Sequence, residues 1–263
     1  MDFSDADALG DLVARERRSD APALVVPGAG RRYDYRRFCT TAYKTGNFWR
    51  RLGVHASPES ANVDSPRAER TKADATVAVA ADPAPEPVFA LFGAALLGGR
   101  AEFVRETPAG SLGARVAVAP REAVASYDLP SGGQRVAYGG PPEDPSVAHF
   151  ERDVWSENPA FPESPVDPEA VALVASDRTF SHADLLASAR SVADRWGLEP
   201  GDEVAVRASL AQPGAVVAGV LAPLLAGAAV LFPDEDAAGD VAVVGDEDEK
   251  WPESRTLAAS DVL

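Results

Sequence analysis

The chain has 263 residues, of which 46% are hydrophobic and 25% charged, so it can bury a sizeable core and is not a small disulfide-stapled scaffold. Its net charge of −16 argues against nucleic acid as a partner, and the lack of a long uncharged run argues against a membrane partner or span. One cysteine, Cys39, allows no internal disulfide, so we expect a reducing, cytoplasmic location.

Acidic residues outnumber basic residues, and few of the basic residues are lysines. Aspartate and glutamate number 41 against 25 lysines and arginines, and only Lys44, Lys72 and Lys250 are lysines. This acidic, lysine-poor and alanine-rich composition resembles that of cytosolic proteins from extreme halophiles, in which about 1 M salt limits repulsion between surface carboxylates to about 3 Å. An ordinary acidic protein is the alternative.

The first predicted elements lie before residue 125. An apolar strand at 23–25 leads to Asp34, which is a good N-cap for the helix that follows. In that helix, apolar or small residues recur at three- and four-residue spacing and predict one buried stripe, made of Phe38, Cys39, Ala42, Thr45, Gly46 and Trp49. A strand, a helix and a strand are then expected at 77–79, 85–99 and 115–118.

The pattern repeats later in the chain. At an offset of 147 residues, Asp34 matches Ser181 and Trp49 matches Trp196. Ser181 is the expected N-cap of the second helix, Asp184 lies in its first turn, and the apolar stripe is Leu185, Leu186, Ala189, Val192, Ala193 and Trp196. We interpret the two copies as an internal repeat and expect each tryptophan to face the sheet of its own copy.

The alternation of strands and helices predicts an α/β fold made of two similar halves, each a largely parallel sheet flanked by helices. We expect a first subdomain at 1–125 and a second subdomain with an acidic tail at 169–263. Between them, 126–168 is rich in proline and reads as a connector with one short strand near 135–138. A second irregular segment, 55–74, is expected to be a surface insertion.

Several short motifs resemble the N-terminal part of the acyl-CoA synthetase (AMP-binding) family of adenylate-forming enzymes. They are the aromatic pair Tyr33 and Tyr35, the helix end at Leu52 and Gly53, the Gly-Asp-Glu-Val strand at 201–204 and the helix end at 224–228. The resemblance covers roughly residues 9–244. It implies the fold of the family's N-terminal subdomains, and it implies that any activity belongs to the AMP-forming acid–CoA ligase class.

One departure from the family bears on function. Family members have a Ser/Thr/Gly-rich loop ending in Pro-Lys-Gly, whose backbone N–H groups and lysine hold the phosphates of ATP. Here the corresponding residues, 175–180, read Ala-Ser-Asp-Arg-Thr-Phe, without glycine or lysine. Ser176, Arg178 and His182 are the candidates left for cofactor binding, and a plain surface turn is the alternative for Arg178.

Other titratable residues give no catalytic or metal site. Ser181, His182 and Asp184 are the residue types of a hydrolytic triad, but three neighbours at a helix start point in different directions, so capping is the favoured role of Ser181. The acidic runs 234–236 and 246–249 lack the register of a calcium loop and are expected to be solvated. We predict no catalytic residue, no metal and no cofactor.

The family's adenine and metal motif, ribose-binding aspartate and mobile C-terminal domain have no counterpart before Leu263. We therefore expect a truncated, catalytically degenerate relative that acts as a binding, regulatory or accessory protein. Its expected partners are another copy of itself, a full-length acyl-CoA synthetase or another enzyme of acyl-CoA metabolism. The alternative is a ligase subunit or fragment that still binds an acyl or adenylyl ligand and needs a partner chain for catalysis.

Overall fold

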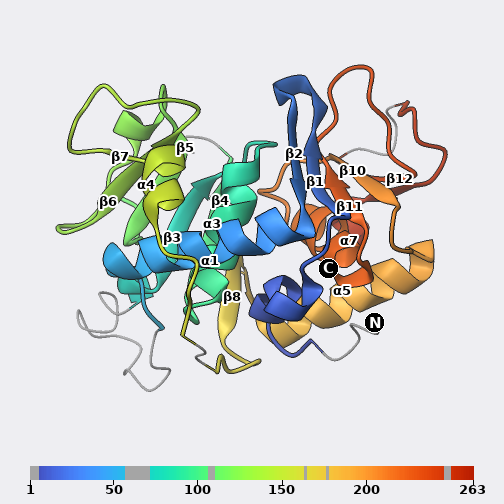
Figure 1. Cartoon of the computed structure of the whole chain (residues 1–263), viewed down its shortest axis with the longest axis horizontal. Coiled ribbons are helices and arrows are strands. Elements are labelled where there is room, and N and C mark those ends of the chain that lie inside the picture. The colour runs from blue at the N-terminus through green and yellow to red at the C-terminus, as the bar shows by residue number, and fades with distance from the viewer. Residues whose placement is uncertain (1–5, 57–71, 106–109, 163–164, 176–177, 246–249) are drawn as a thin grey trace.

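The computed structural model describes residues 6–56, 72–105, 110–162, 165–175, 178–245 and 250–263. Two mostly parallel sheets flanked by helices form an α/β fold, as the sequence predicts. Figure 1 shows the sheets in the two halves of the view, with helix α1 (Tyr35–Arg51) running across the front. Most of the expected insertion at 55–74 lies outside the described residues. None of the described helices is both long and apolar enough to cross a bilayer.

The six-stranded sheet has the order β13-β12-β10-β11-β1-β2. Its neighbours pair in parallel except for β1 and β2, which form an antiparallel hairpin at one edge. Its strands are β1 (Pro22–Val26), β2 (Arg31–Asp34), β10 (Glu203–Arg207), β11 (Ala229–Leu231), β12 (Val241–Val244) and β13 (Thr256–Ala258).

The seven-stranded sheet has the order β7-β6-β5-β3-β4-β8-β9. Here too the pairing is parallel except for an antiparallel edge hairpin, β8–β9. Its strands are β3 (Thr76–Ala80), β4 (Arg100–Val104), β5 (Val116–Pro120), β6 (Gln134–Tyr138), β7 (Ala148–His149), β8 (Val171–Ala175) and β9 (Arg178–Ser181).

Each edge hairpin belongs to a sheet whose other strands come from a different part of the chain. β1 pairs with β11 of the six-stranded sheet, and β8 pairs with β4 of the seven-stranded sheet. Each sheet therefore combines strands from both sequence copies, and its strands do not follow the expected boundaries at 125 and 169. An apolar strand pattern predicts burial, but it does not say which of two apolar sheet edges the strand joins. The largest apolar cluster accordingly spans both sheets and includes Leu24 and Val77.

Helix α1 begins and packs as its sequence predicts. The Asp34 carboxylate accepts a hydrogen bond from the backbone N–H of Arg37 at 2.6 Å, and all six residues of the predicted stripe are buried. The helix packs on α3 (Pro85–Ala95), and the Trp49 indole N–H donates to the carbonyl oxygen of Ala90 at 3.2 Å. Trp49 therefore lies against a helix, and not against a sheet as expected.

Helix α5 (His182–Trp196) begins with a capping box. Ser181 Oγ accepts from the Asp184 N–H at 3.1 Å, and the Asp184 carboxylate accepts from the Ser181 N–H at 3.0 Å. Gly197, with a φ of 60°, ends the helix in the left-handed conformation. Trp196 is buried like Trp49. Both copies thus run strand, strand, helix, and their common ancestry stays a hypothesis.

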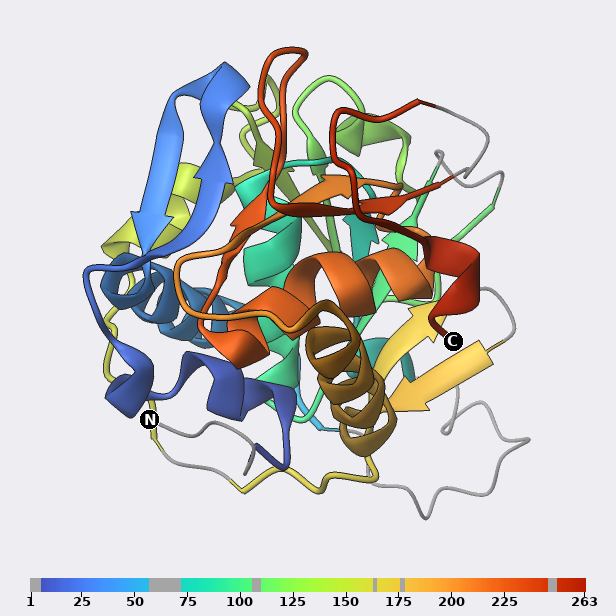
Figure 2. The ribbon, with the colours of Figure 1, turned by 90° about the vertical axis from the view of Figure 1, so that its right-hand side faces the viewer.

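A buried helix at 213–226 lies beside α5 (Figure 2). It consists of α6 (Pro213–Val216), the π-helical turn η5 (Val217–Leu221) and α7 (Ala222–Ala226). A Cβ at Gly219 would lie 2.7 Å from Val206 Cγ2, so glycine permits the close approach of this helix to β10. The 3₁₀ helices are η1 (Leu9–Val13), η2 (Arg15–Arg17), η3 (Pro27–Ala29), η4 (Val124–Ser126) and η6 (Ala259–Asp261).

The expected connector at 126–168 has more regular structure than its composition indicates. β6 covers the short strand expected near 135–138, but β7 and helix α4 (Phe150–Ser156) follow it. β6 and β7 extend the seven-stranded sheet in parallel, and α4 packs on α1. The prolines lie in the loops between these elements and leave the ladder intact, which is why a proline count misjudges the segment.

Candidate functional site

The segment in the place of the family's phosphate loop is a tight hairpin. β8 ends at Ala175, β9 begins at Arg178, and these two residues pair across the antiparallel strands. Only residues 176 and 177 connect the strands, and the candidate Ser176 lies outside the described residues. The connection is thus far shorter than a loop that wraps phosphates.

Arg178 is exposed at the start of β9, an edge strand. Its guanidinium carbon lies 4.8 Å from the ring centroid of Phe180 on the same strand. Within the described residues no ion pair involves Arg178, and the structure does not bring it together with His182. The described part of the chain also holds no group of three His, Cys, Asp or Glu side chains that could bind a metal ion.

His182 is fully buried at the first position of α5. Its Nδ1 accepts a hydrogen bond from the backbone N–H of Leu9 at 3.1 Å, which assigns the proton of the neutral ring to Nε2. Burial lowers the pKa of His182 to about 4, although the charges of Asp11 and Asp167 oppose this shift. At neutral pH the ring is therefore uncharged and fastens the N-terminal segment to α5.

A different part of the fold contains a cavity of about 230 Å³, between β2, α1, the start of α3 and α4. We call it the α1–α4 cavity. Its apolar lining includes the rings of Tyr33, Phe89, Phe150 and Trp155. Phe89 and Phe150 are buried, whereas Trp155 is 73% exposed, which makes it the one strongly exposed large hydrophobic side chain in the described ranges. The cavity thus has an aromatic wall with one ring at the surface.

Two carboxylates line the cavity, and both have partners. Glu86 Oε1 lies 2.6 Å from Arg31 Nη2, and the same guanidinium donates to the hydroxyl of Tyr33. Burial raises the pKa of Glu86, and Arg31 opposes the shift. Glu151 accepts from the Gly139 N–H at 2.7 Å, and its other oxygen lies 3.1 Å from His149 Nε2.

Two cations of the lining, Lys44 and Arg37, have no carboxylate partner in the described part of the chain. Lys44 Nζ donates to the carbonyl oxygen of Trp155 at 2.6 Å and lies 5.0 Å from the centroid of the Trp155 ring. The Arg37 guanidinium lies 5.0 Å from the ring centroid of Tyr33. Considering the described residues, neither Lys44 nor Arg37 forms an ion pair with a carboxylate. The cavity therefore combines aromatic rings with two cations that have no carboxylate partner among the described residues.

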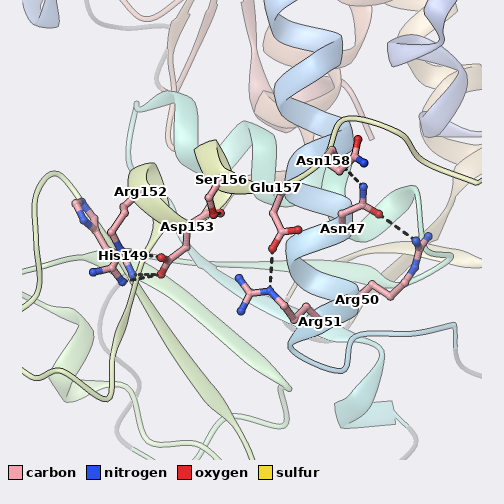
Figure 3. Close-up of polar contacts among 9 residues, drawn as sticks. All are labelled: Asn47, Arg50, Arg51, His149, Arg152, Asp153, Ser156, Glu157 and Asn158. Carbon is pink, nitrogen blue, oxygen red and sulfur yellow. Dashed lines mark hydrogen bonds and ion pairs between the residues drawn. The ribbon is translucent and has the colours of Figure 1, made fainter.

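Polar contacts hold the α4 wall of the cavity against α1. The Asn47 side-chain amide donates to the carbonyl oxygens of Asn158 at 2.7 Å and Ala160 at 2.9 Å. Arg51 Nε donates to Glu157 Oε1 at 2.8 Å. Figure 3 shows that Asn47 and Arg51, which make these contacts, both lie on α1. Two side chains of α1 therefore hold the chain that follows α4, next to the cavity.

The sequence analysis missed the α1–α4 cavity, although a signal for it was present. Helix α1 carries five basic residues and no acidic residue in a chain with a net charge of −16. Trp155 lies in the proline-rich stretch that was expected to be a connector with one short strand. The run of basic residues on one helix of an acidic protein was visible in the sequence, but the exposure of Trp155 and its contact with Lys44 come only from the fold.

Comparison with solved structures assigns the fold. The anthranilate CoA ligase AuaEII, solved with anthranoyl-AMP, matches 92% of this chain with a TM-score of 0.69 and 17% identity. ATP-bound MatB from Rhodopseudomonas palustris matches 90% with a TM-score of 0.66 and 13% identity. The nonribosomal peptide synthetase FmoA3, bound to AMPPNP, matches 89% with a TM-score of 0.67 and 21% identity. This chain has the fold of the N-terminal subdomains of adenylate-forming enzymes.

The chain spans only part of these proteins, namely 50% of AuaEII, 49% of MatB and 24% of FmoA3. Comparison of the sequence with known protein families and with curated proteins gives no match. The structural likeness confirms the expected resemblance to the N-terminal subdomains of adenylate-forming enzymes at the level of fold.

Proposed function

We propose that this protein has the adenylate-forming fold without the adenylation reaction, and that it acts by binding as a regulatory or accessory protein. The observation that carries the proposal is the two-residue connection between β8 and β9, in which Ala175 pairs directly with Arg178. A phosphate cradle requires a loop whose successive backbone N–H groups surround the anion. A connection of two residues is too short to form such a loop.

The charges near the hairpin support the same proposal. Adenylation develops negative charge at the α-phosphate, and enzymes stabilise it with cations and donors already in position. Arg178 is the one cation among residues 175–180, and the sequence places Asp177 beside it. His182 cannot compensate, because it is buried and uncharged at neutral pH.

A protein that acts by binding needs a partner. We propose a second copy of this chain, a full-length acyl-CoA synthetase or another enzyme of acyl-CoA metabolism. We also propose a cytoplasmic location, because the single cysteine, Cys39, is a buried free thiol and allows no internal disulfide.

The test is ATP–pyrophosphate exchange by the purified protein with a panel of aliphatic and aromatic carboxylic acids. We expect no exchange above that of a heat-inactivated sample, while an active CoA ligase in the same buffer gives the positive control. Exchange by the protein alone would overturn the proposal. Exchange that appears only after a partner chain, itself inactive, is added would favour the ligase-subunit alternative.

A further inference from the structure

We propose that the α1–α4 cavity binds a planar anion, an aromatic or heteroaromatic ring that carries an acidic group, with the ring against Trp155 and the acidic group held by Arg37 and Lys44. The site shares no residue with the β8–β9 hairpin. This inference rests on the proposed binding function and gives it a ligand class.

The distribution of charge carries the first step. A net charge of −16 repels anions from most of the surface, so an anion site requires local cations that the protein does not neutralise itself. On α1, Arg36 pairs with Asp20 at 3.1 Å and Arg51 pairs with Glu157 at 2.8 Å. Arg37 and Lys44 line the cavity, and within the described residues they have no carboxylate partner.

Both cations have donors to offer. Arg37 and Lys44 lie seven residues apart, on the same face of α1, so their side chains extend along one side of the helix. The Lys44 ammonium has three donors and uses one of them on the carbonyl oxygen of Trp155. The Arg37 guanidinium donates no hydrogen bond to a described residue. The oxygens of a carboxylate or phosphate fit these donors and supply the missing negative charge.

The aromatic lining of the cavity favours a ligand with an aromatic ring. Lys44 lies over the Trp155 ring, and the 73% exposure of Trp155 leaves indole surface for a ligand ring to stack on. Phe150 and Phe89 provide a buried apolar floor. A cavity of about 230 Å³ is smaller than a site for drug-sized molecules, which favours ligands of one or two rings.

The binding test uses four probes with the same ring system and different charge. They are 1-naphthyl phosphate, 1-naphthoate, the uncharged 1-naphthalenemethanol and the cationic 1-naphthylmethylamine. Isothermal titration calorimetry at neutral pH should give saturable binding of both anions, and roughly ten-fold or more weaker binding of the other two probes. Tighter binding of the phosphate identifies a phosphorylated ligand, and tighter binding of the carboxylate identifies an aromatic acid; both results support the site.

Matched variants then locate the binding. Arg37→Gln and Lys44→Met each remove one charge while keeping most of the side-chain stem, and each should weaken anion binding about ten-fold without changing the binding of the uncharged probe. Arg36→Gln is the control, because Arg36 is the neighbouring cation on the same helix but does not line the cavity. Trp155→Ala should weaken the binding of all four probes, and circular dichroism checks that every variant is folded.

Three results would overturn this inference. They are equal affinity for all four probes, equal weakening by Arg36→Gln and Arg37→Gln, and no saturable binding of either anion up to about 1 mM. Its failure is distinguishable from that of the proposed function. Exchange activity would contradict the proposed function without bearing on the cavity, whereas absent naphthyl binding would leave the exchange result unchanged.

Discussion

Arg207 on β10 holds the carboxylate of Glu253 with two hydrogen bonds, Nε to Oε2 and Nη2 to Oε1, each 2.8 Å long. The Glu253 side chain is fully buried, and that of Arg207 is 11% exposed. The same carboxylate accepts from the Gly239 N–H at 3.0 Å. One buried ion pair therefore fastens the segment between β12 and β13 to the six-stranded sheet.

Removing one charge of this pair should destabilise the fold. Glu253→Gln keeps the shape of the side chain but leaves the Arg207 charge without its counter-charge, so we expect the free energy of unfolding to fall by about 3 kcal/mol. Urea denaturation measures it. Glu122→Gln is the control, because Glu122 pairs with Arg121 on the exposed surface and its loss should leave stability nearly unchanged. Equal effects of the two substitutions would contradict the structural role of Glu253.

His182 should make stability depend on pH. Its pKa is about 4 in the folded protein and near 6.5 in the unfolded chain, so the unfolded chain takes up the proton first as the pH falls. The contribution of the neutral His182 ring to the free energy of unfolding is complete above pH 6.5 and is lost as the pH falls toward 4. We expect wild type to lose about 3 kcal/mol more than His182→Asn over this range, since the asparagine oxygen can accept from Leu9 but does not titrate.

Urea denaturation at a series of pH values provides this measurement. His55→Asn is the control, because the His55 side chain is 59% exposed, and this variant should follow the wild-type pH profile. If wild type and His182→Asn lose stability in parallel, the histidine is not buried as a neutral ring.

The two helix caps should each contribute measurably to stability. Asp34→Ala and Ser181→Ala remove the side-chain acceptors at the starts of α1 and α5, and each should lower the free energy of unfolding by about 1 kcal/mol. Ser188→Ala, in the middle of α5, lacks a capping role and should be neutral or slightly stabilising. Thermal denaturation of the three variants would contradict the capping assignment if Ser188→Ala were as harmful as Ser181→Ala.

The elements predicted from sequence are those that local interactions decide. Asp34, Ser181 and Gly197 act within one helical turn, so the bounds of α1 and α5 follow from their neighbours. The exchange of the two hairpins depends on pairing between distant segments, such as Leu24 with Val230, and no local pattern specifies it.

The cavity was harder to predict than the helices for the same reason. Its residues Arg31, Glu86 and Trp155 come from separate segments, and each is an ordinary residue in its own stretch of sequence. His182, a candidate for cofactor binding in the sequence, shows a related difficulty. Burial under the N-terminal segment decides its chemistry, and the packing of Leu9 on α5 is not visible in the sequence.

The halophile hypothesis predicts stabilisation by salt. Repulsion among surface carboxylates weakens as the screening length falls, so the melting temperature should rise between about 0.05 M and 2 M potassium chloride. The acidic run 246–249 lies outside the described residues, and the matched variants therefore neutralise the exposed acids Glu143, Glu235 and Asp236. Their effect should be largest at low salt. A melting temperature independent of chloride would contradict the hypothesis.

The central proposal is that this protein has no working ATP site. Isothermal titration calorimetry of the wild-type protein with ATP and magnesium tests it most directly. Because Ala175 pairs with Arg178 and only two residues separate them in the sequence, we expect no saturable heat up to about 1 mM ATP, which corresponds to binding weaker than about 4 kcal/mol. A dissociation constant in the micromolar range would contradict the account.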